Sequence, residues 1–429
     1  MHCSLAGWTV CVDFLYTGDK MLEDACAVIS GERVERVHTG GFRGQPDLDL
    51  RGRSSLALPG VIDMHVHLRG LKLSYKEDEV SGTAAAASGC VTLVADMPNT
   101  QPPLRTPEAL REKLASLEAG AKVDYTVYAG VPRSYGEAVE MASMGIAGFK
   151  IYPEDLVNLD SIKNVLEAAE EAGILVVLHP ESHDMFAGPD YGWLRRVARP
   201  CHAEAASVEL LHDAARECGC KPRVHITHAS CPATVVESKK RGFTVDVTPH
   251  HLFLSEEEVA GPTHSWGKVN PPLRGVGERS LLTQLTIEGL VDAIASDHAP
   301  HSTWEKWMHP AIAPPGFPWL EWWPGFTAAR LMRAVGLERF YSMVSQTPST
   351  ILGVGDRCLW DGCPATISVL QLERTRVYHK GYTKALYTPV LGMESFDCAA
   401  TVIRGKIAYT AWEGVRGGAT GVLATRVVH

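Results

Sequence analysis

Residues 58–67, LPGVIDMHVH, mark the point at which the chain changes character. From here on, short apolar runs alternate with helix-like stretches for about 300 residues, a pattern typical of βα units. The helix-like stretches include residues 106–118 and 161–172, and Gly173 directly after the second is a typical C-cap. The apolar runs lie at residues 61–67, 91–97, 125–131, 147–152, 174–179, 224–228, 244–248 and 292–296.

The number and composition of these runs predict the fold class. Near-continuous apolar strands in βα alternation are typical of a parallel sheet with helices on its outer face. Eight of them indicate a closed (β/α)8 barrel of the TIM type, in the α/β class. A doubly wound open sheet is the alternative interpretation, but no GxGxxG motif follows the first strand.

Both ends of the chain are rich in strand-like segments instead. Residues 8–15 and 27–30 precede the barrel, and residues 365–370, 400–403 and 406–409 follow it. We infer a small composite β-sandwich domain built from both termini. The predicted boundaries are residues 1–58 and 361–429 for the two parts of this domain and residues 59–360 for the barrel.

The composition excludes several classes of protein. Apolar residues make up 45% and charged residues 21% of the 429 positions, which is typical of a globular protein with a sizeable core. The net charge of −9 argues against nucleic acid as a partner, because such a surface needs a basic face. Without a signal-peptide pattern or a run of 18 apolar residues, the chain is predicted to be soluble, cytoplasmic and free of membrane contact. Its 11 scattered cysteines are interpreted as buried free thiols in a reducing compartment.

Polar residues stand where the predicted strands end. The first strand ends in His65-Val66-His67, and alternate residues of a strand point to the same side, so both imidazoles face the barrel axis. That arrangement suits two nitrogen ligands on one metal ion, although satisfied histidines are the simpler alternative. Lys150 lies inside an apolar run, where it is either a side chain that reaches out to solvent or a desolvated, reactive amine.

Three further strands end in the same way. His179 ends the fifth, His228 the sixth and Asp297 follows the eighth, whereas His225 faces the other side and is interpreted as structural. Each histidine alone is more often part of a core than a ligand. Together, six candidate ligands from five strands fall on the C-terminal rim, which carries the chemistry in barrels of this class. The sequence therefore predicts a metal site at this rim.

With these residues in place, the chain resembles the amidohydrolase superfamily, and more narrowly the dihydroorotase family. The resemblance extends from residue 59 to residue 405. Seven blocks carry it: HVHLR at 65–69, DMPNT at 96–100, GFK at 148–150, PHHL at 249–252, NPPLR at 270–274, SDHAPH at 296–301 and PGFP at 315–318.

The resemblance implies a centre with two Zn²⁺ ions. Lys150 would be carboxylated by CO₂ and bridge the ions, with His65, His67 and Asp297 on one and His179 and His228 on the other. Asp297 would also be the catalytic residue that takes the proton from the attacking hydroxide and delivers it to the leaving ring nitrogen. The implied reaction is the reversible cyclisation of N-carbamoyl-L-aspartate to L-dihydroorotate in pyrimidine biosynthesis.

The resemblance also implies which residues bind the substrate. Arg69, Asn99 and His301 would bind the ring carboxylate, Asn270 would contact the substrate, and Gly316 would offer backbone groups to the ring. A guanidinium matches a carboxylate in shape and charge. The chain departs from the family at Gly70-Leu71-Lys72, where the family has EPG, so the loop beside this pocket is expected to differ.

Two alternatives stay open at this point. A hydantoinase or allantoinase would use the same metal ligands, but Arg69 and His301 argue against it. An inactive scaffold for aspartate transcarbamoylase would have lost ligands, whereas all six positions are filled here. Aspartate transcarbamoylase and a second copy of the chain are both candidate partners. The tryptophans of residues 304–323 either anchor such an interface or pack a long loop onto the barrel.

Overall fold

The computed structural model describes residues 7–259, 265–417 and 421–426. Within them, eight parallel strands form one sheet in which every strand pairs with its neighbours along the chain. The sheet closes through a bridge between Val66 and His298, where the His67 amide donates to the His298 carbonyl over 2.7 Å. The predicted barrel is therefore confirmed. Its strands are β6 (Val61–Val66), β7 (Val91–Asp96), β8 (Asp124–Gly130), β9 (Gly148–Ile151), β10 (Leu175–Leu178), β11 (Arg223–Ile226), β12 (Thr244–Val247) and β13 (Ala293–Ile294).

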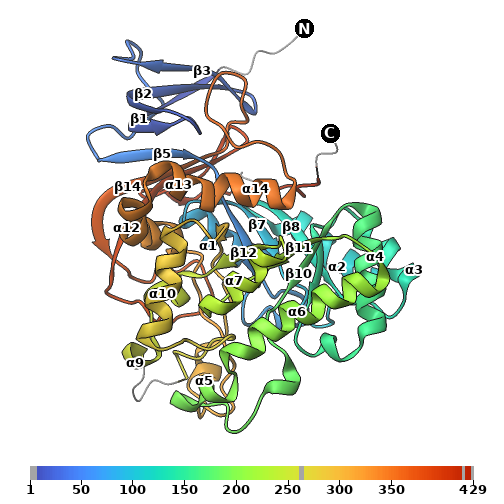
Figure 1. The fold of residues 1–429 in the computed structure, drawn as a ribbon. Coiled ribbons are helices and arrows are strands. Elements are labelled where there is room, and N and C mark those ends of the chain that lie inside the picture. The colour runs from blue at the N-terminus through green and yellow to red at the C-terminus, as the bar shows by residue number, and fades with distance from the viewer. Residues whose placement is uncertain (1–6, 260–264, 418–420, 427–429) are drawn as a thin grey trace.

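Helices cover the outside of the barrel (Figure 1). The predicted helix at residues 161–172 is α4, which begins after the N-cap Asn158 and ends at Gly173 with a left-handed φ of 64°. The longer helices are α1 (Glu79–Ser88), α2 (Pro107–Gly120), α3 (Tyr135–Ala142), α4 (Leu159–Ala172), α6 (Cys201–Cys218), α7 (Pro232–Lys240), α10 (Val276–Ile287) and α12 (Trp323–Val335). The shorter ones are α5 (Arg195–Ala198), α8 (Pro249–Phe253), α9 (Glu256–Val259), α11 (Thr303–Lys306), α13 (Leu337–Tyr341) and α14 (Thr347–Leu352).

The two ends of the chain build a second, mixed sheet beside the barrel (Figure 1). Its strand β5 pairs in parallel with β1 and antiparallel with β14, so the N-terminal and C-terminal strands meet there. Only Gly60 separates β5 from the first barrel strand. The strands are β1 (Trp8–Tyr16), β2 (Met21–Ser30), β3 (Arg33–Thr39), β4 (Leu48–Asp49), β5 (Ser55–Pro59), β14 (Ile367–Arg376), β15 (Glu394–Ile403), β16 (Lys406–Thr410) and β17 (Gly414–Val415).

The cysteines differ from the prediction. The structure pairs ten of the eleven in disulfides, and the remaining Cys3 lies outside the described residues. The interpretation of these ten as free thiols was wrong. In three pairs the cysteines lie 15, 30 and 308 positions apart, so the fold brings them together, whereas in the other two they lie only 2 and 5 positions apart. The pairs are Cys11–Cys26, Cys90–Cys398, Cys201–Cys231, Cys218–Cys220 and Cys358–Cys363.

The tryptophans of residues 304–323 divide into two groups. Trp319, Trp322 and Trp323 are buried against the barrel, whereas Trp304 and Trp307 are 58% and 73% exposed. The predicted packing of the tryptophans onto the barrel is therefore confirmed for Trp319, Trp322 and Trp323 only. No helix in the described part of the chain is long and apolar enough to cross a membrane.

Candidate active site

A cavity of about 450 Å³ opens at the C-terminal ends of the barrel strands. Of the predicted site residues, nine line it, Lys150 is fully buried in strand β9, and His301 contacts the lining residue Arg69. The nine are His65, His67, Arg69, Asn99, His179, His228, Asn270, Asp297 and Gly316.

Three predicted ligands converge on one point of this cavity. His65 Nε2 and His67 Nε2 lie 3.2 and 3.1 Å from Asp297 Oδ1, and 3.3 Å from each other. All three ligand atoms lie within 4.8 Å of one another, and all three side chains are buried. Two imidazoles and a carboxylate in this arrangement are a donor set that could hold a divalent metal ion.

Hydrogen bonds at the far side of each ring fix the orientation of these two imidazoles. His65 Nδ1 lies 2.6 Å from Thr227 Oγ1, and His67 Nδ1 lies 2.6 Å from the carbonyl oxygen of Asn99. A histidine bound on one nitrogen usually has such a partner on the other, which leaves the Nε2 atoms directed at the cavity. Asn99 was predicted as a substrate contact. In the structure, its side-chain oxygen Oδ1 positions the His67 ring.

The other two predicted histidine ligands lie beside the first pair. The ring of His228 is 4.3 Å from that of His179 and 5.0 Å from that of His65, measured between centroids. His179 Nε2 lies 2.8 Å from a carboxylate oxygen of Glu181, so its Nδ1 is the atom left for a ligand. Burial opposes the charge of Glu181, but Arg199 and His179 together lower its pKa to about 2.

Glu181 is a functional residue that the sequence analysis missed. The signal in the sequence is a carboxylate two residues after the predicted ligand His179. The Glu181 amide donates to the His179 carbonyl, so this segment forms a tight turn that brings the two side chains together. Its buried carboxylate also accepts two hydrogen bonds from the Arg199 guanidinium. It therefore orients the His179 ring and increases its basicity.

We predict that Glu181→Gln lowers the affinity of the site for Zn²⁺ about 10- to 100-fold, because the neutral amide no longer supports His179. Competition with a coloured chelator measures this affinity. The matched control is Glu170→Gln, an exposed carboxylate of α4, which is expected to leave the affinity unchanged. A folded Glu181→Gln protein with the affinity of the unmodified chain would contradict this role.

Lys150 is the most unusual side chain of the site. Its amine is fully buried, has no hydrogen-bond partner among the described residues and lies 5.6 Å from the ring centre of Tyr152. Burial lowers the pKa of Lys150 to about 7, so the neutral amine is present at physiological pH. The Tyr152 hydroxyl is a second buried group without a partner among the described residues, and its side chain lines the cavity. The sequence analysis did not single out Tyr152.

Asp246 of β12 connects the histidine-bearing strand ends. Its carboxylate accepts hydrogen bonds from the His228 amide at 2.6 Å and from Thr227 Oγ1 at 3.1 Å, and it lies 2.8 Å from His225 Nε2. His225 is thus structural, but its direction was predicted wrongly. It pairs across the sheet with Val177, which in turn pairs with Lys150, so His225 faces the same side of the sheet as Lys150. An acidic residue inside the apolar run at 244–248 was the signal for Asp246, which the sequence analysis missed.

The backbone is strained at three of the predicted site residues. Arg69, His228 and Asp297 have φ angles of 58°, 40° and 48°, in the left-handed region that non-glycine residues rarely adopt. Each follows a barrel strand closely, and this turn redirects its side chain from the strand towards the cavity. Such strain clusters at functional sites because the surrounding structure must hold it.

One side of the cavity is positively charged. Arg69 Nη2 lies 3.3 Å from His301 Nε2, and Lys76 donates to His301 Nδ1 over 3.2 Å. The buried Lys113 donates to the Arg69 carbonyl and forms ion pairs with Asp96 and Glu79. The Glu79 carboxylate fills the space that a side chain at position 70 would need, which explains the glycine there.

Gly316 and Asn270 also line the cavity, and His301 Nε2 lies 2.9 Å from the carbonyl oxygen of Pro315, which directly precedes Gly316. The Gly316 amide donates to the Lys268 carbonyl, and its carbonyl accepts from Lys306 Nζ and the Tyr387 hydroxyl. Its backbone groups are therefore engaged within the protein, whereas we expected them to face the substrate. A Cβ at this position would lie 2.2 Å from the Ala299 carbonyl oxygen, so only glycine fits. Asn270 accepts a hydrogen bond from Arg195.

Comparison with known proteins agrees with this geometry. Residues 54–185 match the dihydro-orotase-like family. The dihydroorotase of Saccharolobus solfataricus is 35% identical over 365 residues, which cover 85% of this chain and 86% of that protein. The dihydroorotase of Sulfolobus acidocaldarius is 35% identical over 371 residues, which cover 85% of this chain and 87% of that protein. Among solved structures, the L-hydantoinase of Arthrobacter aurescens superimposes with a TM-score of 0.87 at 23% identity, over 97% of this chain and 99% of that one. The structural match supports the barrel fold, and the sequence matches are to proteins of one family.

Proposed function

The chain belongs to the dihydroorotase family, and from this membership we propose that it interconverts N-carbamoyl-L-aspartate and L-dihydroorotate at a two-zinc centre in the cavity described above. The observation that carries the proposal is the convergence of the ligand atoms of His65, His67 and Asp297 beside the guanidinium of Arg69. Relatives named dihydroorotase and structural neighbours named hydantoinase place the chain among cyclic amide hydrolases.

The residues present fit a metal pair. The buried Lys150 amine without a partner and the converging ligand atoms are what such a centre needs, because uncompensated polar groups are costly to bury. In the proposal, His65, His67 and Asp297 would hold one Zn²⁺, His179 and His228 would hold the other, and carboxylated Lys150 would supply ligand oxygens to both. When bound, the two ions lower the pKa of water and polarise the carbonyl under attack.

The residues of the chain itself then perform three tasks. Asp297 accepts a proton from the attacking water and returns it to the ring nitrogen that leaves. In the metal-free site, burial raises the pKa of Asp297 to about 7. Arg69, with His301 beside it, binds the ring carboxylate and orients the ring, and the buried surroundings exclude bulk water.

The assignment of the substrate rests on Arg69. We predict that Arg69→Met raises KM for L-dihydroorotate about 10- to 100-fold, because a charge-assisted bidentate contact is lost. The same change is expected to leave the slow turnover of hydantoin nearly unaltered, since hydantoin has no ring carboxylate. A spectrophotometric assay of ring opening measures both substrates. Equal losses with the two substrates would show that Arg69 does not recognise the carboxylate.

Turnover of the unmodified protein tests the proposed function directly. The assay compares L-dihydroorotate, hydantoin and allantoin at matched concentrations, and L-dihydroorotate is expected to have the highest kcat/KM. Faster turnover of hydantoin or allantoin would assign the chain to the sister activities. The inactive-scaffold alternative predicts no turnover and less than one metal ion per chain, which metal analysis of the purified protein detects.

The partners and location of the protein also stay proposals. Aspartate transcarbamoylase, which would supply carbamoyl-aspartate, and a second copy of the chain are the candidate partners. A cytoplasmic location was predicted from the absence of a signal-peptide pattern.

A further inference from the structure

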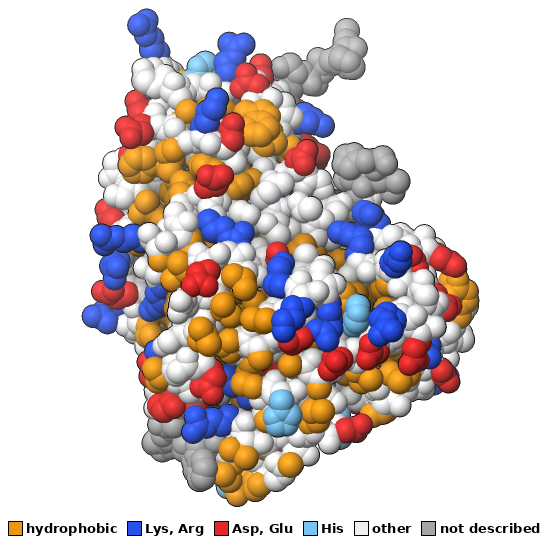
Figure 2. Space-filling view, viewed as in Figure 1, with side chains coloured by type: hydrophobic (Ala, Val, Ile, Leu, Met, Phe, Trp, Pro, Cys, Tyr) orange, Lys and Arg blue, Asp and Glu red, His pale blue; other side chains and the backbone are white. Residues whose placement is uncertain are grey.

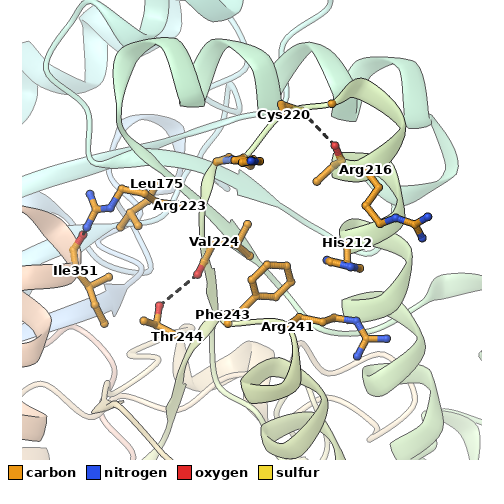
Figure 3. Close-up of a pocket in the computed structure, with 15 residues that line it drawn as sticks. Leu175, His212, Arg216, Cys220, Arg223, Val224, Arg241, Phe243, Thr244 and Ile351 are labelled. Carbon is orange, nitrogen blue, oxygen red and sulfur yellow. Dashed lines mark hydrogen bonds between the residues drawn. The ribbon is translucent and has the colours of Figure 1, made fainter.

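A second cavity lies at the opposite end of the barrel from the candidate active site (Figure 3). It occupies about 650 Å³, a volume typical of sites for small molecules. The first residues of three strands contribute to it, namely Leu175 of β10, Arg223 of β11 and Thr244 of β12. The C-terminal end of α6 and the turn after α7 complete its wall. His179 and His228 follow the other ends of β10 and β11, roughly 13 Å away along a four-residue strand.

The floor of this cavity is apolar. Figure 3 shows the side chains of Val224 and Phe243 at its centre, with Leu175 and Ile351 on one side and His212 on the other. Val224, Leu175 and Ile351 are buried within the fold, and the Phe243 and His212 rings lie 6.0 Å apart. An aromatic ring placed here would bury apolar surface against this floor.

The rim of the cavity is basic. It carries Arg216, Lys221, Arg223 and Arg241, and none of the fifteen described residues that line the cavity is acidic. Figure 2 shows Lys and Arg side chains gathered over this part of α6 and α7, with Asp and Glu side chains beside them. We call the lining residues of this cavity the basic pocket.

The charges of the basic pocket are only partly neutralised. Arg241 pairs with Glu237 and Arg216 with Asp213, both outside the pocket. Lys221 is exposed and has no ion-pair partner in the described part of the chain, and Arg223 donates only to backbone carbonyls, those of Thr350 and Ile351. Burial, and after it the nearby Arg426, lowers the pKa of Arg223.

We propose that the basic pocket binds a small aromatic anion, with its ring on Val224 and Phe243 and its phosphate or carboxylate group beside Lys221 and Arg223. An apolar floor with a few charged groups at its edge is the usual design of a small-molecule site. Figure 3 shows the Arg223 guanidinium beside Ile351, whereas those of Arg216 and Arg241 lie on the side of His212. Because Arg216 and Arg241 already have carboxylate partners, Lys221 and Arg223 set the orientation of the ligand. Because the pocket shares no lining residue with the active-site cavity, this proposal is independent of the proposed enzymatic function.

Fluorescence titration with 1-naphthyl phosphate tests the proposal on the full-length protein. The expected Kd is on the order of 0.1 mM, a value ordinary for a ligand of this size. Inorganic phosphate carries only the anionic group, and 1-naphthol carries only the aromatic ring. Each is expected to bind at least tenfold more weakly than 1-naphthyl phosphate. Comparison with 1-naphthoate distinguishes a phosphate from a carboxylate. Whichever of the two compounds binds more tightly indicates which anionic group the natural ligand carries.

Lys221→Glu is expected to raise the Kd for 1-naphthyl phosphate about tenfold, since it reverses one charge of the rim. The matched control is Lys406→Glu, an exposed lysine of β16 in the other sheet, with no expected effect. An excess of N-carbamoyl-L-aspartate is expected not to displace the probe. The proposal fails if the probe does not bind at millimolar concentration, if phosphate alone binds as tightly, if Lys221→Glu has no effect, or if carbamoyl-aspartate displaces it.

Discussion

Alanine in place of Lys150 is expected to lower kcat for L-dihydroorotate at least about 1000-fold, because the bridge between the two proposed metal ions is removed. The fold should persist, since the substitution leaves a cavity but no uncompensated charge in the barrel. Short carboxylic acids such as acetate and propionate are expected to restore part of the activity by supplying a carboxylate at the vacated position.

The chemistry of this prediction follows from the surroundings of the Lys150 amine. An ammonium has no lone pair and cannot bind a metal ion, so the protonated form of Lys150 is not a ligand. With a pKa of about 7 the amine is neutral in a sizeable fraction of molecules, and the neutral form can add to CO₂. The addition forms an N–C bond and releases one proton, which leaves an anionic carbamate with two oxygen donors. The buried amine has no hydrogen-bond partner among the described residues, so no existing hydrogen bond has to break for this addition.

Rescue distinguishes a bridging role from a structural one. The matched control is Lys113→Ala, which removes another fully buried lysine but one whose amine is already paired with Asp96 and Glu79. This variant is expected to lose activity through the Arg69 loop, without rescue by carboxylic acids. A ¹³C resonance of a carbamate after exposure to labelled CO₂ provides a readout besides activity. A Lys150→Ala enzyme with nearly unaltered kcat would contradict the proposal.

The barrel and its rim could be predicted because their signals are local. Each barrel strand is a short apolar run that a helix follows, and this alternation is visible without knowledge of contacts. In a parallel barrel the ends of all strands meet at one rim, so residues that follow them, such as His67, His179 and Asp297, come together by topology alone. In the second sheet, the predicted segments coincide with β1, β2, β14, β15 and β16, whereas β3, β4, β5 and β17 were not predicted.

The residues that were missed depend on contacts between distant parts of the chain. Asp246 supports His228 from the neighbouring strand, and Lys113 of α2 supports Arg69. Neither of these two contacts joins residues at a fixed spacing along the chain, so the sequence does not show which residue each side chain supports. Cys90 and Cys398 were interpreted as free thiols for the same reason, because only the packing of β15 against the barrel brings them together. Gly316 was predicted by resemblance to contact the substrate through its backbone. In the structure, the buried Lys306 and Tyr387 side chains donate hydrogen bonds to its carbonyl oxygen.

Replacement of Asp297 by asparagine is the second change with a large expected effect. Proton transfer by a positioned side chain contributes about 100- to 10,000-fold to a rate, and Asp297 is also a proposed metal ligand. We therefore expect kcat to fall at least about 1000-fold, with a smaller change in KM, since the proton moves in the transition state. The matched control is Asp292→Asn, at the other end of the same strand, where Asp292 pairs with Lys239.

The order of activities among variants of Asp297 separates proton transfer from metal binding. An asparagine keeps an oxygen donor in nearly the same place but cannot accept a proton, whereas a glutamate keeps the carboxylate and displaces it by one methylene. If the essential task is proton transfer, Asp297→Glu retains more activity than Asp297→Asn when both contain the full amount of metal. The ordering depends on Asp297 Oδ1, which lies between the two imidazoles and is the only oxygen among the three converging ligand atoms. An asparagine enzyme with full metal and the higher kcat would assign the proton transfer to another group.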